Sequence, residues 1–133
     1  MIEPSSRPDR VLGVLRVPGA PESIGEMRGF TRHKLGVDHA RVDDVTVCVS
    51  ELGTNGYEHT ASGKPGGYLT LVLSDHDGMI RVELIDDGGA RSTPRIRCGD
   101  PNAEHGRGLF LVRALASRWG VDGTTTWCEF DPT

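Results

Sequence analysis

Three side chains that can do acid–base or metal chemistry recur at helical spacing near the middle of the sequence. Glu51, Asn55 and His59 stand four residues apart, so on an α-helix they form one polar stripe. A carboxylate can accept the proton of an attacking hydroxyl or water. The carbonyl oxygen of an asparagine is a hard ligand that suits Mg²⁺, an ion that holds phosphate oxygens. The stripe therefore predicts proton transfer and Mg²⁺-phosphate chemistry, and a solvated helix face is the alternative.

The helix that must carry this stripe is predicted over 38–60, with Asp38 as a suitable N-cap. Its core-facing side is predicted by an apolar stripe of Val42, Val45, Val49 and Leu52. Gly53 and Gly56 each cost about 1 kcal/mol against alanine inside a helix. Their presence predicts that another element packs close to this part of the backbone.

A second carboxylate, Asp86, stands at the end of a strand predicted over 79–86. Under the two-residue period of a strand it shares the core-facing side with Ile80, Val82 and Leu84. A carboxylate on that side needs a polar partner, because burial without one is costly. Two roles remain open: an acceptor for an N–H group of a ligand at the mouth of a pocket, or a turn aspartate that caps its own loop.

A third signal is a glycine pair that opens an apolar segment, where a helix is predicted over 106–116 with Gly120 as its stop. A glycine-rich helix N-terminus offers bare backbone N–H groups and a positive dipole end to an anion. The segment is not a Walker phosphate loop, because no Lys-Ser/Thr follows the glycines, and an ordinary turn is the alternative. Residues 90–105 show no periodicity, and a loop of that length predicts a functional lid.

The other segments complete a pattern of short strands and helices in one domain. They are strands over 11–17, 68–74, 119–121 and 124–130 and a helix over 22–35 that ends at Gly36. A turn with an Asp-Gly pair separates 68–74 from 79–86 and predicts an antiparallel hairpin. With 133 residues we expect a flexible tail over 1–10 and a single domain over 11–133.

Composition and charge argue against several classes of protein. The net charge is −4 with no run of lysine or arginine, which argues against direct nucleic-acid binding. No apolar run approaches the roughly 20 residues that span a bilayer, and the N-terminus has no signal-peptide core. Cys48, Cys98 and Cys128 are odd in number and widely spaced, which favours free thiols in a reducing compartment. We therefore expect a cytoplasmic protein that binds neither nucleic acid nor membrane.

Taken in order, these signals resemble the motifs of the GHKL superfamily, the Bergerat-fold or histidine-kinase-like ATPases. The superfamily's asparagine box matches 51–59, its two glycine boxes match 86–90 and 106–109, and its Gly-Thr pair matches 123–124. The resemblance covers about residues 10–131. It implies an α+β fold, a two-layer α/β sandwich whose mixed, mostly antiparallel sheet is covered on one face by about three helices.

The resemblance also implies a role for each matching residue. Glu51 would be the general base, Asn55 would hold Mg²⁺, and Asp86 would accept the amino group of adenine. Thr124 would support the adenine site, with Thr125 as a rival. The implied nucleotide-binding residues are Asn55, His59, Asp86, Gly88, Gly106, Arg107, Gly108, Leu109 and Thr124.

The size of the chain and three local sequences, which begin at Ser50, Arg118 and Trp127, resemble one branch of the superfamily. This branch holds the stand-alone anti-sigma-factor serine/threonine kinases of bacterial sporulation and stress-response switches. The resemblance implies a protein kinase that uses ATP and Mg²⁺. Its partners would be a sigma factor and a small anti-sigma-factor antagonist protein, and a homodimer through the first helix is a further possibility.

Two departures from that branch keep alternatives open. Ala90 ends the first glycine box in place of a glycine, and Glu104-His105 stands where the sporulation kinases place an arginine near the γ-phosphate. ATP binding is therefore the stronger expectation and phosphoryl transfer the weaker one. One alternative is a catalytically inactive nucleotide-binding module that sequesters a partner. Another is an ATPase whose hydrolysis drives dimer closure, although the transducer domain that this would need is missing.

Overall fold

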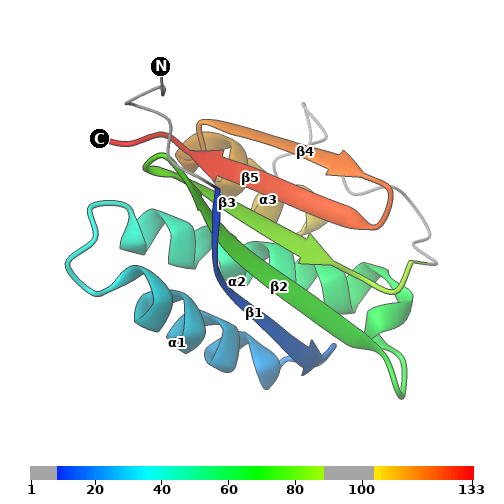
Figure 1. Cartoon of the computed structure of the whole chain (residues 1–133). Helices are drawn as coiled ribbons and strands as arrows, with labels where there is room; N and C mark the ends of the chain where they lie inside the picture. The colour runs from blue at the N-terminus through cyan, green and yellow to red at the C-terminus, as the bar shows by residue number, and fades with distance from the viewer. Residues whose placement is uncertain (1–8, 89–103) are drawn as a thin grey trace.

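A computed structural model describes residues 9–88 and 104–133 of the chain. The strands of its single sheet are β1 (Arg10–Pro18), β2 (Tyr68–His76), β3 (Met79–Ile85), β4 (Arg118–Asp122) and β5 (Thr125–Phe130). They lie in the order β1-β2-β3-β5-β4, and each described pairing is antiparallel (Figure 1). The predicted hairpin is the pair formed by β2 and β3. The resemblance implied a mixed, mostly antiparallel sheet, and the described strands pair in the antiparallel direction throughout.

The helices are α1 (Ser23–Leu35), α2 (Val42–His59) and α3 (Glu104–Leu115), and a short 3-10 turn, η1 (Ala61–Gly63), follows α2. All three α-helices cover the same face of the sheet (Figure 1). The predicted α+β two-layer sandwich is therefore confirmed. Within the described ranges, no helix is both long enough and apolar enough to cross a membrane.

The core lies between the helices and the covered face of the sheet. The strands contribute alternate buried residues: Leu69, Leu71 and Leu73 of β2, Ile80, Val82 and Leu84 of β3, and Thr126, Cys128 and Phe130 of β5. The helices contribute Met27, Val45, Val49, Leu52, Leu109 and Val112, among others. Each large apolar side chain that is buried stabilises the fold by roughly 1.5–3 kcal/mol. The alternation on β3 confirms the predicted face, which Asp86 continues just past the strand.

The two glycines of α2 lie where other elements come close to the helix. A Cβ on Gly53 would lie 2.6 Å from the Cε of Met27 on α1, and a Cβ on Gly56 would lie 2.6 Å from a methyl group of Leu69 on β2. Both distances are too short for real side chains. The predicted close packing against this part of the helix is therefore confirmed, with α1 close to Gly53 and β2 close to Gly56.

The prediction of Asp38 as the N-cap of α2 is wrong. The helix begins at Val42, after a turn in which the N–H of His39 donates to the carbonyl oxygen of Gly36 at 3.1 Å. The Nδ1 of His39 then accepts the N–H of Arg41 at 3.0 Å. The imidazole therefore satisfies a backbone donor just ahead of the helix, where the sequence suggested an aspartate.

Two predictions about α3 also need correction. The helix begins at Glu104, so Gly106 and Gly108 lie inside its first turns and do not precede it. Gly120 is not its stop, because the helix ends at Leu115 and Gly120 belongs to β4. A Cβ on Gly120 would lie 2.7 Å from the ring of Trp127, so this glycine makes room for the indole. The lid predicted over 90–105 lies outside the described residues, apart from its last two, which belong to α3.

Candidate functional site

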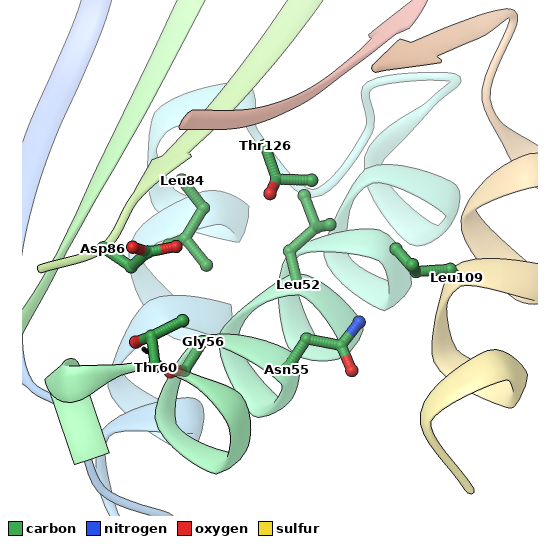
Figure 2. A pocket seen from close by; sticks show the side chains of 8 residues that line it. All are labelled: Leu52, Asn55, Gly56, Thr60, Leu84, Asp86, Leu109 and Thr126. Carbon is green, nitrogen blue, oxygen red and sulfur yellow. Dashed lines mark hydrogen bonds between the residues drawn. The ribbon is translucent and has the colours of Figure 1, made fainter. Parts of the chain in front are cut away.

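A pocket lies where α2, α3 and the ends of β3 and β5 meet (Figure 2). Its lining residues are Leu52, Asn55, Gly56, Thr60, Leu84, Asp86, Leu109 and Thr126. The space between its atoms is about 260 Å³, open solvent at the mouth included. The pocket therefore combines a carboxylate, a carboxamide and two threonine side chains with apolar surface.

Asn55 is the polar side chain that α2 contributes to the pocket. It is 9% exposed, and its Nδ2 has no hydrogen-bond partner among the described residues. Leaving a buried donor without a partner costs about 1–3 kcal/mol. Natural structures seldom contain such a group unless a water, an ion or a ligand meets it. The buried amide of Asn55 therefore fits a pocket that takes up a polar group from a water, an ion or a ligand.

Asp86 contributes a carboxylate from the opposite end of the pocket (Figure 2). Its backbone N–H donates to the carbonyl oxygen of Thr124 at 3.0 Å, which ties the end of β3 to the turn before β5. Its Oδ1 accepts the N–H of Gly88 at 2.7 Å. The carboxylate has further lone pairs beyond this bond. Both roles that the sequence left open are therefore compatible: Asp86 caps its own turn and can still accept an N–H group from a ligand.

The environment of Asp86 destabilises the charged form of its carboxyl group. Burial raises the pKa of Asp86 above its ordinary value of 3.8, and the neighbouring charge of Asp87 raises it further. The hydrogen bond from Gly88 acts in the opposite direction but does not cancel the effect of burial. A hydrogen bond donated by a ligand would therefore stabilise the charged form of the Asp86 carboxylate.

Glu51 lies one helical turn before Asn55, beside the pocket and not in its lining. It is half-buried. Burial raises the pKa of Glu51 above its ordinary value of 4.5, and the like charge of Glu58 raises it further. A raised pKa brings a carboxylate closer to the range in which a general base works well near neutral pH.

The other predicted residues flank the pocket. His59 lies at the end of α2, with its Nε2 3.7 Å from an oxygen of Glu58, and it does not line the pocket. Gly88 has a φ of 77°, in the left-handed region that favours glycine. Thr124 contributes its backbone oxygen to Asp86, while Thr126, two residues further along β5, supplies the lining side chain.

Of the predicted nucleotide-binding residues, the pocket brings together Asn55, Asp86 and Leu109. Gly106, Arg107 and Gly108 belong to the first turns of α3, and their side-chain surroundings lie outside the described part of the chain. Five lining residues were not predicted from the sequence: Leu52, Gly56, Thr60, Leu84 and Thr126. For Thr126 a signal was present, because it shares the core-facing side of its strand with Cys128 and Phe130.

Comparison with known proteins identifies the class of domain. Residues 17–129 match the family model of the histidine kinase-like ATPase domain. The chain therefore belongs to this family, and the resemblance carried by the ordered motifs is confirmed. Because the family is one of ATPase domains, membership implies that the protein binds ATP.

Among curated proteins the chain is similar to several that bear the name serine-protein kinase RsbW. It is 25% identical to the one from Oceanobacillus iheyensis over 114 residues, which cover 76% of this chain and 72% of that protein. It is 24% identical to those from Bacillus pumilus and Bacillus subtilis, with 76% of this chain covered and 72% and 71% of theirs. These relatives are serine kinases by name, and the identity to them is low.

Proposed function

We propose that the protein is an ATP-dependent serine/threonine kinase that phosphorylates a small anti-sigma-factor antagonist and binds a sigma factor. The observation that carries this proposal is that one pocket is lined by both the Asp86 carboxylate and the buried amide of Asn55, whose Nδ2 has no hydrogen-bond partner within 9–88 and 104–133. The reaction type is supported by relatives that are serine kinases by name. The partners are supported by the local sequences that resemble anti-sigma-factor kinases.

The adenine base occupies the end of the pocket beside Asp86 in this proposal. The carboxylate accepts the amino N–H of the base, and Leu52 and Leu84 offer apolar surface to the ring. The phosphates extend towards α3, which begins at Glu104, five residues before the lining residue Leu109. That separation is about 7–8 Å along a helix axis. The positive end of the helix dipole favours negative charge there.

Asn55 fits the role of a Mg²⁺ ligand. Mg²⁺ is commonly held by one or two protein oxygens together with substrate phosphates and water. The carboxamide oxygen of Asn55 offers one such ligand, and its buried Nδ2 gains a partner when a nucleotide or an ordered water enters the pocket. Bound Mg²⁺ would neutralise charge on the phosphates.

Glu51 is the general base in the proposed transfer. Its carboxylate takes the proton of the acceptor hydroxyl while that oxygen forms a bond to the γ-phosphorus, and the bond from the same phosphorus to the β–γ bridging oxygen breaks to release ADP. Because protein kinases depend mainly on positioning and electrostatics, the fixed spacing of Glu51 and Asn55 on one helix supports this assignment.

The first experiment is calorimetry of ATP binding with and without Mg²⁺, on the wild type, Asp86→Asn and the control Asp75→Asn. Asp75 is a matched control, because its Oδ1 also accepts a glycine N–H, that of Gly78 at 2.8 Å, at the other end of the hairpin. We expect Mg²⁺-dependent binding that Asp86→Asn weakens by at least tenfold, since a charge-assisted hydrogen bond is lost. Asp75→Asn should bind as the wild type does.

The second experiment measures transfer of labelled γ-phosphate to a purified anti-sigma-factor antagonist. Transfer that requires Mg²⁺ supports the kinase. ATP binding without any transfer would replace the kinase with a nucleotide-binding module that acts by sequestration. No binding of ATP at millimolar concentration would overturn the nucleotide site itself.

A further inference from the structure

Ser62 is a fully buried serine just outside the pocket, in the η1 turn that follows α2. Its Oγ accepts the backbone N–H of Asp87 at 2.8 Å. Its own backbone N–H donates to the Oγ1 of Thr60 at 3.0 Å, and that hydroxyl donates to the carbonyl oxygen of Gly56 at 2.6 Å. A continuous hydrogen-bonded path therefore joins the last turn of α2 to the turn after β3.

The position of Ser62 is fixed by backbone on several sides. A Cβ on Gly19, after β1, or on Gly67, before β2, would overlap the carbonyl oxygen of Ser62. A Cβ on Gly63 would overlap the carbonyl oxygen of Tyr57. The N–H of Gly19 donates to the carbonyl oxygen of Gly67 at 3.1 Å, which closes the two strand ends around the η1 turn. Because backbone atoms cannot yield as a flexible side chain can, the Ser62 hydroxyl is held at a set place.

The Ser62 hydroxyl is one of several groups that hydrogen-bond the segment next to the Asp86 carboxylate. Besides the bond from Asp87 to Ser62, the N–H of Ala61 donates to the carbonyl oxygen of Gly88 at 2.8 Å. The N–H of Tyr68 donates to Oδ2 of Asp87, also at 2.8 Å. The N–H of Gly88 in turn holds Oδ1 of Asp86 at 2.7 Å. Residues 87 and 88 are therefore hydrogen-bonded to the η1 turn and to β2, and the Asp86 carboxylate is hydrogen-bonded to Gly88.

We propose that Ser62 is a positioning residue that aims the Asp86 carboxylate and thereby sets the discrimination between adenine and guanine nucleotides. This inference rests on the proposed function, because it assumes that the base lies beside Asp86. A carboxylate in the right place accepts the amino N–H of adenine, whereas guanine presents a carbonyl oxygen at the same position and is repelled. Strong discrimination of this kind requires polar groups that are held in place.

A purely structural role for Ser62 would have a different signature. The hydroxyl would satisfy a buried N–H group, and its removal would lower the stability of the fold without any change in the relative affinity for two nucleotides. Thr31 provides the matched control, because it is also fully buried and its Oγ1 donates to the carbonyl oxygen of Met27 at 2.8 Å, on α1. Thr31→Val removes a hydroxyl that is equally buried and also bonded to backbone, on a helix that contributes no lining residue to the pocket.

The experiment measures the affinities for Mg²⁺-ATP and Mg²⁺-GTP of the full chain as wild type, Ser62→Ala, Ser62→Cys and Thr31→Val. Ser62→Cys keeps a side chain of similar size with a weaker acceptor, and it carries the test if Ser62→Ala does not fold. We expect Ser62→Ala to lower the ratio of ATP to GTP affinity by about tenfold, the equivalent of one lost hydrogen bond. Ser62→Cys should fall between Ser62→Ala and the wild type, and Thr31→Val should keep the wild-type ratio.

Amide hydrogen exchange without nucleotide gives a second readout, in which the N–H of Asp87 should exchange faster in Ser62→Ala than in Thr31→Val. An unchanged affinity ratio in both Ser62 variants, with a wild type that binds ATP, would overturn the role of Ser62 and leave the proposed function intact. A wild type that binds neither nucleotide would instead overturn the proposed function. The two failures are therefore distinguishable.

Discussion

The Oδ1 of Asp86 accepts the backbone N–H of Gly88 at 2.7 Å, only two residues further along the chain. Gly88 itself adopts a φ of 77°, in the left-handed region, and this dihedral orients the carbonyl group of Gly88. The same turn places the carbonyl oxygen of Gly88 on the N–H of Ala61, beside the end of α2. One left-handed glycine therefore links the pocket carboxylate to the helix on the other side of the pocket.

Replacing Gly88 with alanine should strain this turn. A left-handed conformation costs an ordinary residue about 1–2 kcal/mol, whereas a Cβ at this position would make only ordinary contact, 3.5 Å from a methyl of Thr124. We expect Gly88→Ala to lower the free energy of unfolding by about that amount, measured by urea denaturation, and to weaken ATP binding.

Gly29→Ala is the control. Gly29 is exposed on α1 with open space around it, and alanine there should stabilise the helix by up to about 1 kcal/mol. Equal stability of Gly88→Ala and the wild type would contradict the role of this turn.

The raised pKa of Asp86 predicts a pH dependence of stability. Burial raises the pKa of the folded protein's Asp86 above 3.8, its ordinary value. As the pH rises through 3.8, the unfolded chain loses this proton first, so the carboxyl group favours unfolding increasingly until the pH passes the folded pKa. Asp86→Asn removes the titration and keeps an oxygen that can accept from Gly88.

We therefore expect the stability of Asp86→Asn relative to the wild type to rise with pH across this window and then to stay constant. Urea denaturation of both proteins from about pH 3 to 7 would test the prediction, and the difference between the two curves isolates Asp86 from the other carboxylates. A difference that does not change with pH would show that Asp86 titrates alike in the folded and unfolded chain.

The parts of the site that depend on local periodicity were predictable from the sequence. A two-residue period fixes which side of a strand a residue takes, whatever strand lies beside it. It placed Asp86 in line with the buried row of β3 correctly. A four-residue period likewise placed Asn55 on a helix face that borders the core, where it is buried and lines the pocket.

The parts that depend on contacts between distant segments were not predictable. Thr126 lines the pocket because it lies opposite Leu84 in the register of β3 and β5, and the sequence of β5 alone does not give that register. The start of α2 was misplaced. An N-cap side chain accepts a backbone N–H two or three residues later, but the N–H of Arg41 is accepted by the imidazole of His39 and not by Asp38. The buried position of Ser62 depends in part on Gly19, which follows β1 and is far away in the sequence.

Glu129, on the open face of the sheet, should stabilise the fold without affecting the pocket. It is held between two arginines: its Oε2 is 2.6 Å from Nη1 of Arg81 and its Oε1 is 2.9 Å from Nε of Arg118. Its side chain is only 15% exposed. Burial alone would raise the pKa of Glu129, but the hydrogen bonds from Arg118 and Arg81 outweigh it and hold the pKa below its ordinary value of 4.5.

We expect Glu129→Gln to lower the free energy of unfolding by about 1–3 kcal/mol at pH 7, since two hydrogen bonds between charged groups are weakened. The contribution of a lowered pKa is present above pH 4.5 and is lost as the pH falls through the folded pKa, so the difference from the wild type should shrink in acid. Denaturation at pH 7 and below pH 4 measures this. Glu83→Gln, which loses a longer contact of 3.7 Å with Arg81, should cost less than about 1 kcal/mol. ATP affinity should stay unchanged in both variants.

Glu51→Gln should separate phosphoryl transfer from nucleotide binding. The substitution removes the proposed base and keeps the shape of the side chain, and a general base contributes typically 10²–10⁴-fold to a rate. We expect transfer of labelled phosphate to a purified antagonist to fall by about that factor, while calorimetry shows ATP affinity within about twofold of the wild type.

Glu58→Gln supplies the control on the same helix. Glu58 is exposed, and its charge contributes to the raised pKa of Glu51. The variant should therefore keep the plateau rate of transfer while the acidic limb of its pH–rate profile moves to lower pH, because the Glu51 carboxylate then forms at lower pH. If Glu51→Gln transfers phosphate as fast as the wild type, Glu51 is not the base, and the acceptor hydroxyl must lose its proton to another group or directly to solvent.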